Sequence, residues 1–229
     1  MKGLFLFILT ASIVLCQAQS NISKKLIGLA SRASVEISVK VTDDADWRRE
    51  GTGWAYKDQL TIITAKHVIQ DSIMNDSGDQ VITQYAKIRV KFSDDNYVDV
   101  TAHQEAKDED ISILTLDKSE IKVKHQLLHI AKVNPEVGNF TLLIGFPQWF
   151  GPMLSTGYVT SFYTREGKTR FTMSNPIIGG HSGSAVLNKY GQVIGVAVSC
   201  WRYEVSVSNA ITTEKLREAL KSLNIDPNK

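Results

Sequence analysis

Short apolar segments typical of β-strands recur along most of the chain. In the first of them, Val35, Ile37, Val39 and Val41 alternate with polar residues. This alternation is typical of a β-strand with one buried face. Similar segments, separated by Gly, Asp and Asn at the turns, follow at 53–56, 60–64, 88–92, 98–102, 111–116, 140–144, 157–162, 170–173, 185–187, 193–198 and 205–211. Many short strands at regular spacing predict an all-β sandwich or barrel rather than alternating β-α units.

The N-terminus has a different pattern. Lys2 precedes an apolar run over residues 4–15, and the small residue Ala18 follows. This order indicates a secretory signal peptide cleaved after Ala18. The apolar run is too short for a membrane-spanning helix, which needs about 20 apolar residues. Two alternatives stay open: a buried N-terminal helix, and a lipid anchor on Cys16, which would require a small residue where Leu15 stands. We therefore expect a secreted or periplasmic protein.

Two further regions differ from the strand pattern. The stretch 118–138 is irregular and falls midway, so it is placed to link two β halves. Near the C-terminus Thr213 can cap a helix, in which Leu216, Leu220 and Leu223 share one face. The resulting division is a signal peptide over 1–18, a lead-in over 19–33, a first β unit over 34–117, a linker over 118–138, a second β unit over 139–211, and a helix with its tail over 212–229.

Charge and cysteine content limit the classes of function. The formal net charge is only +2 and Lys and Arg form no cluster, which argues against nucleic-acid or membrane-surface partners. Loss of the signal peptide leaves Cys200 as the single cysteine, so no internal disulfide is expected. Cys200 ends an apolar strand. We interpret it as a small core residue, with a nucleophile as the alternative.

Three segments carry residues suited to nucleophilic catalysis. His67 follows an apolar strand, Asp110 opens another one, and Ser182 lies among glycines just before a third. A serine hydroxyl becomes nucleophilic when a neighbouring base removes its proton, and a histidine with a pKa near neutral suits that task. A carboxylate then fixes the imidazole tautomer. Asp110 is preferred because it abuts the strand, whereas Asp108 and Glu109 are expected to stay in solvent.

The glycines around Ser182 suggest a second role for this segment. The tetrahedral intermediate of acyl transfer carries an oxyanion that two backbone N–H groups can stabilise. We assign these donors to Gly180 and Ser182, since glycine lets the backbone turn freely. The remaining histidines show no ligand spacing, so no metal or cofactor is expected, and we predict surface positions for three of them: His103, His125 and His129.

At this point the sequence resembles the chymotrypsin-fold serine peptidases, and within them the HtrA-like and glutamyl-endopeptidase-like branches. The order His, Asp, Ser is that of the family. The matching segments are Gly51-Thr-Gly-Trp54, Thr64-Ala-Lys-His67-Val, Asp110-Ile-Ser-Ile-Leu, Gly145-Phe-Pro147, Thr156-Gly-Tyr-Val-Thr-Ser161, Gly180-His-Ser182-Gly-Ser184 and Gly191-Gln-Val-Ile-Gly195-Val.

The resemblance implies two six-stranded antiparallel β-barrels with a C-terminal helix and an active site between the barrels. His67 and Asp110 would come from the first barrel and Ser182 from the second. It also implies protein or peptide substrates that pair, in extended form, with Ser199, Cys200 and Trp201. It says nothing of the oligomeric state.

Two departures from the family pattern are informative. His181 stands where many relatives carry Asp or Asn, so an activation switch of the trypsinogen kind is not expected. The segment Asn175-Pro-Ile-Ile178 has no carboxylate, which argues against cleavage after Arg or Lys. The chain also ends soon after the predicted helix, so we expect no PDZ module.

The resulting hypothesis is a secreted serine endopeptidase. Two rivals remain: a binding scaffold of the same fold that has lost its chemistry, and an esterase that uses the same three residues.

Overall fold

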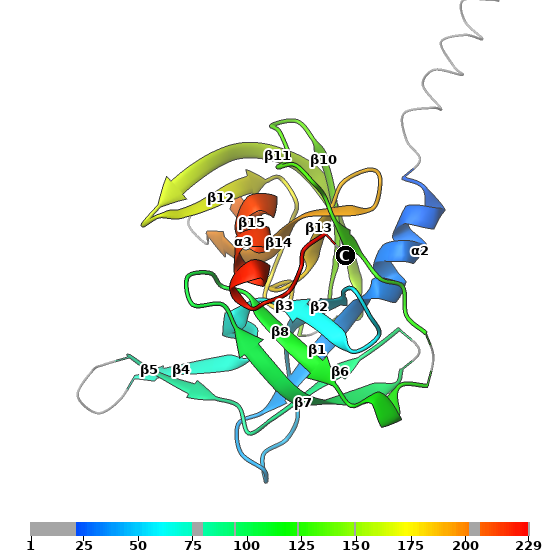
Figure 1. Ribbon diagram of the computed structural model, residues 1–229, viewed down its shortest axis with the longest axis vertical. Helices are drawn as coiled ribbons and strands as arrows, with labels where there is room; N and C mark the ends of the chain where they lie inside the picture. Colours follow the sequence, from blue (N-terminus) through cyan, green and yellow to red (C-terminus); the bar gives the residue numbers. More distant parts are fainter. Residues whose placement is uncertain are drawn as a thin grey trace, which may run out of the picture.

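The computed structural model describes residues 22–74, 80–93, 95–122, 124–148, 150–201 and 207–228, without the side chains of residues 72–74, 80 and 199–201. It consists of two β-barrels packed end to end, with the first barrel below the second in Figure 1. The sequence-based prediction of two six-stranded antiparallel barrels followed by a helix is confirmed. The expected signal peptide lies outside the described residues.

The first barrel closes in the strand order β1-β2-β3-β8-β7-β6. Its pairing of β3 with β8 sets Thr64 opposite Ser112, so the residues that follow β3 lie beside those that precede β8. Gly53 permits close packing here, because a Cβ on it would lie 2.6 Å from the Ile62 side chain. The strands are β1 (Ser34–Lys40), β2 (Arg48–Ala55), β3 (Thr61–Thr64), β6 (Lys87–Lys91), β7 (Tyr97–Glu105) and β8 (Ser112–Leu116).

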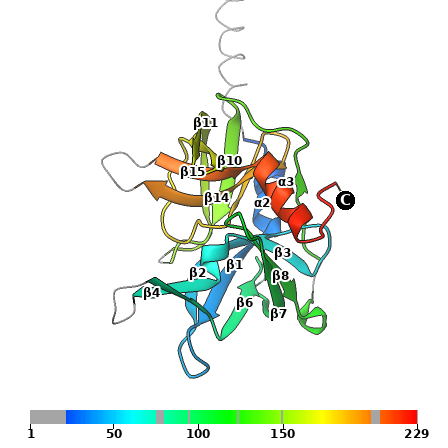
Figure 2. The same cartoon turned by 60° about the vertical axis from the view of Figure 1, so that its left-hand side comes forward.

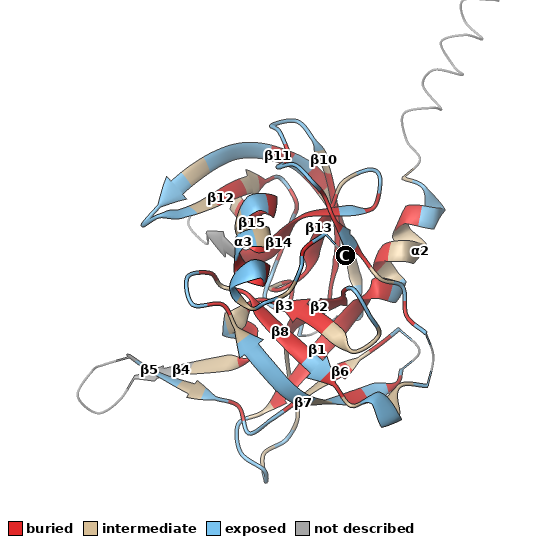
Figure 3. Cartoon of the chain, viewed as in Figure 1, coloured by how far each residue is buried: buried red, intermediate tan, exposed pale blue. Residues whose placement is uncertain are grey.

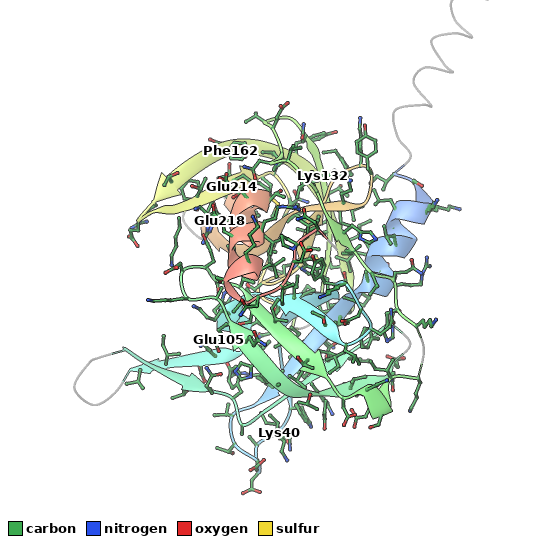
Figure 4. All side chains as sticks on the ribbon, in the orientation of Figure 1. Lys40, Glu105, Lys132, Phe162, Glu214 and Glu218 are labelled. Atoms are coloured by element: carbon green, nitrogen blue, oxygen red, sulfur yellow. The ribbon has the colours of Figure 1, made fainter. Side chains whose placement is uncertain are left out.

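A two-stranded hairpin projects from this barrel, formed by β4 (Gln70–Met74) and β5 (Gln80–Gln84). Glu105, labelled in Figure 4, accepts hydrogen bonds from the side chains of Gln70 and Gln84. The carboxylate thereby fixes the base of both hairpin strands to β7. The sequence pattern does not predict this hairpin, because its residues are mostly polar and show no regular alternation.

The second barrel has the order β13-β10-β11-β12-β15-β14 and closes by pairing β13 with β14. A short strand, β9 (His129–Ile130), adds to it in parallel with β14. The stretch predicted as a linker therefore contributes to this sheet, and it also contains the 3₁₀ turn η2 (Lys118–Glu120). The barrel strands are β10 (Phe140–Gly145), β11 (Met153–Arg165), β12 (Lys168–Met173), β13 (Ala185–Leu187), β14 (Gln192–Trp201) and β15 (Val207–Thr212).

Among the described residues, two helices flank the barrels. Helix α2 (Lys24–Ala33) contacts β1 and β10, and α3 (Thr213–Ser222) contacts β14 and β15; both helices are labelled in Figure 2. The predicted cap was wrong by one residue: Thr212 is the N-cap and its hydroxyl accepts from the N–H of Lys215. Within the described residues, neither helix is long and apolar enough to cross a membrane.

Buried side chains fill both barrels and continue across the junction between them (Figure 3). Ile37 and Trp54 of the first barrel belong to the same cluster as Leu142 and Val196 of the second. His125 is also buried and stacks on Phe92, so its predicted surface position was wrong. The flat apolar face of the imidazole lets it pack like an aromatic side chain.

The expectation that Glu109 stays in solvent was also wrong. Glu109 is 7% exposed, and its carboxylate makes a two-fold contact with the guanidinium of Arg170 on β12, at 2.7 and 3.3 Å. The partner comes from the second barrel and lies 61 positions away in sequence, so neighbouring residues give no sign of it. This buried ion pair joins the barrels directly beside Asp110.

Replacing one partner of this ion pair is expected to destabilise the fold more than replacing both partners with apolar residues. We predict that Arg170→Met lowers the free energy of unfolding by about 3 to 5 kcal/mol, because an uncompensated carboxylate stays buried. The double change Glu109→Leu with Arg170→Met should recover part of that loss. Urea unfolding measures the free energy of unfolding of the single and the double variant. Lys215→Met, at the exposed Lys215–Glu218 pair, is the control. A double variant that is no more stable than Arg170→Met would contradict the prediction.

Candidate active site

His67 sits in a short 3₁₀ turn (Lys66–Val68) directly after β3. Its neighbours Val68 and Ile69 are buried and anchor the turn, while the His67 side chain stays 46% exposed. Lys66 donates to the carbonyl of Ala106 at 2.9 Å, which ties the turn to the loop before β8. The histidine is therefore held by its backbone and presents its ring at the barrel end.

Asp110 makes two hydrogen bonds to this histidine. Its Oδ2 lies 2.7 Å from His67 Nδ1, and its Oδ1 accepts from the His67 backbone N–H at 3.0 Å. The pairing of Thr64 with Ser112 accounts for the contact, because it sets the two loops side by side. The carboxylate thus orients the imidazole and leaves Nε2 as the ring nitrogen that can exchange a proton.

The electrostatic surroundings of His67 stabilise the protonated form of its imidazole. Burial alone would lower the pKa of His67, but the hydrogen bond to Asp110 and the charges of Asp110 and Glu50 outweigh it and raise the pKa above 6.5. For Asp110, burial alone would raise the pKa, but the hydrogen bonds and charge of His67, with the charge of Lys66, lower it. Sequence reasoning missed Glu50, because nothing near it in the sequence connects it to His67.

Ser182 lies on the loop of residues 174–184 that joins β12 to β13, called here the serine loop. Its carbonyl accepts from the N–H of Thr52 on β2 at 2.9 Å. The next residue, Gly183, touches the first barrel so closely that a Cβ would lie 2.3 Å from Thr64 Oγ1 and 3.0 Å from Ala65 N. The serine loop of the second barrel therefore meets the first barrel at the segment that leads into His67.

The hydroxyl of Ser182 points to its own barrel. Its Oγ donates to the carbonyl of Val198 at 3.5 Å, and among the described residues it makes no hydrogen bond to His67. Hydrogen bonds of catalytic groups are often long before substrate binds and tighten afterwards. The structure thus joins His67 to Asp110 directly and brings Ser182 to the same junction.

Gly180, one of the two predicted oxyanion donors, occupies a position that requires glycine. Its φ is +99°, and a Cβ would lie 2.4 Å from the carbonyl oxygen of Phe146. Gly183 has a positive φ as well, +87°. A side chain at either residue would push the serine loop away from its neighbours.

Comparison with known proteins agrees with this arrangement. The family model of the trypsin-like peptidase domain matches residues 51–196. The chain belongs to the trypsin-like peptidase family. The matched range includes His67, Asp110 and Ser182, and the resemblance drawn from the sequence motifs is confirmed. A search of curated proteins by sequence finds no match.

Solved structures of proteases share the fold of this trypsin-like peptidase. The active form of the Rv3671c protease from M. tuberculosis is similar with a TM-score of 0.69 at 14% identity, over 89% of this chain and 86% of that one. A serine endoprotease from Yersinia pestis gives 0.68 at 20% identity, over 89% of this chain and 66% of that one. The HtrA-type protease AlgW, solved with a tripeptide, gives 0.66 at 16%, over 86% and 62%. The chain thus spans about two thirds of the latter two proteins.

His181 directly precedes Ser182 in this trypsin-like peptidase and is buried completely. Its Nδ1 lies 3.1 Å from the carbonyl oxygen and 3.3 Å from the nitrogen of Ile178, so the ring braces the turn that contains Gly180. Burial lowers the pKa of His181, which favours the neutral ring. Gly145 makes room for it, since a Cβ there would lie 2.5 Å from the imidazole.

The predicted substrate-binding residues Ser199, Cys200 and Trp201 form the end of β14. They pair with β15, and their side chains lie outside the described part of the chain. The interpretation of Cys200 as a small core residue therefore stays a prediction. The strand reaches the serine loop, because Ala197 accepts from the N–H of Gly183 at 2.7 Å. Within the described residues, no three His, Cys, Asp or Glu side chains cluster as a metal site.

Proposed function

We propose that this trypsin-like peptidase is a secreted serine endopeptidase that hydrolyses peptide bonds through an acyl-enzyme on Ser182. His67 Nε2 takes the hydroxyl proton as Oγ attacks the scissile carbonyl carbon, and then gives that proton to the leaving amine. A water molecule then attacks the acyl-enzyme ester in the same two steps, and the carboxylic acid product leaves Ser182. Asp110 holds the imidazole and stabilises its positive form. The N–H groups of Gly180 and Ser182 stabilise the oxyanion.

The observation that carries this proposal is the double hydrogen bond between Asp110 and His67 at the junction where the serine loop arrives. A carboxylate with a lowered pKa beside a histidine with a raised pKa matches a base that must accept a proton during the reaction. The N-terminal pattern supports secretion. The position of β14 beside the serine loop supports pairing of an extended peptide with Ser199, Cys200 and Trp201.

One observation favours a second candidate, a peptide-binding scaffold without catalysis. Ser182 Oγ bonds to Val198 rather than to His67, and a serine held there permanently would not attack a substrate. The esterase alternative uses the same residues, and no contact in the described residues distinguishes it from a peptidase.

Labelling with a fluorophosphonate separates these functions. The folded protein should form one adduct, which peptide mapping places on Ser182, and labelling carried out at low pH should be suppressed because His67 is then protonated. Hydrolysis rates for matched amide and ester peptides then decide between peptidase and esterase. A folded protein that forms no adduct would establish the scaffold, and cleavage of the ester peptide alone would establish the esterase.

A further inference from the structure

Thr52 lies where the first barrel contacts the second. It lies on β2 between Gly51 and Gly53 and is fully buried. A Cβ on Gly51 would lie 3.0 Å from the carbonyl oxygen of Ser182 and 2.6 Å from Val68. The flanking glycines thus bring β2 against the serine loop, and Thr52 is the side chain that reaches across at this point.

The Thr52 hydroxyl bridges two segments of the second barrel. It donates to the carbonyl of Gly180 at 2.6 Å and accepts from the backbone N–H of Phe146 at 2.9 Å. The Thr52 backbone N–H donates to the carbonyl of Ser182 at 2.9 Å. One residue of the first barrel therefore binds the carbonyls of both residues that we assign as oxyanion donors.

Gly180 needs such a restraint. Glycine has no Cβ to limit its backbone rotation, so local sterics alone do not fix the direction of its N–H group. The bond from Thr52 Oγ1 holds the Gly180 carbonyl, and the N–H of Phe146 holds the Thr52 hydroxyl in turn. The Gly180 carbonyl and N–H belong to the two peptide groups that meet at its Cα, so holding the carbonyl limits the backbone rotation of Gly180 and thereby restrains its N–H. Donors aimed at the developing oxyanion stabilise it most when they are held in place before the reaction.

We propose that Thr52 is a positioning residue for the reaction: its hydroxyl restrains Gly180 from across the barrel junction, beside the backbone hydrogen bond that Thr52 makes to Ser182. This inference rests on the proposed peptidase function. Thr52 touches neither substrate nor reacting atoms in this role and acts through the serine loop.

The test replaces the hydroxyl while keeping the shape. Thr52→Val removes the bridge with little change in volume, and Thr52→Ser retains it. Thr213→Val is the matched control, because Thr213 is equally buried and donates to the carbonyl of Ile194 at 2.8 Å, away from the serine loop. The readouts are kcat, KM and the inhibition constant of a peptide aldehyde, whose adduct with the serine carries an oxyanion.

We expect Thr52→Val to lower kcat by about 10- to 100-fold and to weaken the aldehyde in parallel, with KM nearly unchanged. Thr52→Ser should stay close to wild type, and Thr213→Val should lose stability but keep its kcat. If Thr52→Val does not fold, Thr52→Cys makes the same comparison, since a thiol is similar in size and a weak donor.

Two results would overturn the inference. The first is a kcat and an aldehyde affinity in Thr52→Val, or in Thr52→Cys, equal to those of Thr213→Val. The second is a loss in Thr52→Ser as large as that in Thr52→Val, which would assign the effect to shape rather than to the hydroxyl. If wild type itself fails to react with the fluorophosphonate, the proposed function fails before this comparison is reached.

Discussion

Ser182→Ala is expected to lower kcat for a peptide substrate by about 10⁵- to 10⁶-fold. The change removes the oxygen that forms the acyl-enzyme, and it leaves the serine loop intact because the loop is held by backbone contacts. The Ser182 carbonyl still accepts from Thr52, and the N–H of Gly183 still donates to Ala197. Thermal unfolding should therefore change little while turnover and fluorophosphonate labelling disappear.

Ser161→Ala provides the matched control, because Ser161 is exposed on β11 and lies outside the proposed mechanism. It should label and turn over like wild type. Cleavage by purified Ser182→Ala above about one per cent of the wild-type rate would show that another residue is the nucleophile.

Asp110→Asn is expected to lower kcat by about 10⁴-fold at neutral pH. The two hydrogen bonds explain why. The Asn oxygen remains the acceptor for the His67 backbone N–H, as Oδ1 is now, so the amide NH₂ takes the place of Oδ2 and faces Nδ1. An NH₂ group donates, and Nδ1 must then accept. The proton moves to Nε2, where the imidazole can no longer take the proton of Ser182.

The pH profile gives a second readout of this variant. In wild type, kcat/KM should fall as pH drops through the raised pKa of His67, above 6.5, because the base must be neutral. Asp110→Asn removes the hydrogen bond and the charge that raise this pKa, so the remaining activity should decline only at lower pH. Asp108→Asn, at an exposed position, should change neither kcat nor the pH dependence of kcat/KM. A kcat within tenfold of wild type in Asp110→Asn would contradict the assigned role.

The fold class could be predicted from local pattern because alternation reports which face of a strand is buried. The segment Val35–Val39 shows it clearly, and most strands lie where the sequence pattern places them. The polar hairpin β4–β5 was missed, since side-chain bonds to Glu105 rather than a buried face hold it. Glu109 and His125 were misplaced because their partners, Arg170 and Phe92, lie far away in the sequence.

Local sequence patterns were enough to place most barrel strands and to single out three residues suited to catalysis, because alternation, glycine spacing and residue chemistry are local properties. Which groups meet is visible only in the folded chain: Asp110 with His67 through the β3–β8 register, Glu109 with Arg170, and Thr52 with the serine loop. These contacts join segments separated by 43 to 128 positions. Their geometry depends on strand register within the first barrel and on how the two barrels pack, which no single segment encodes.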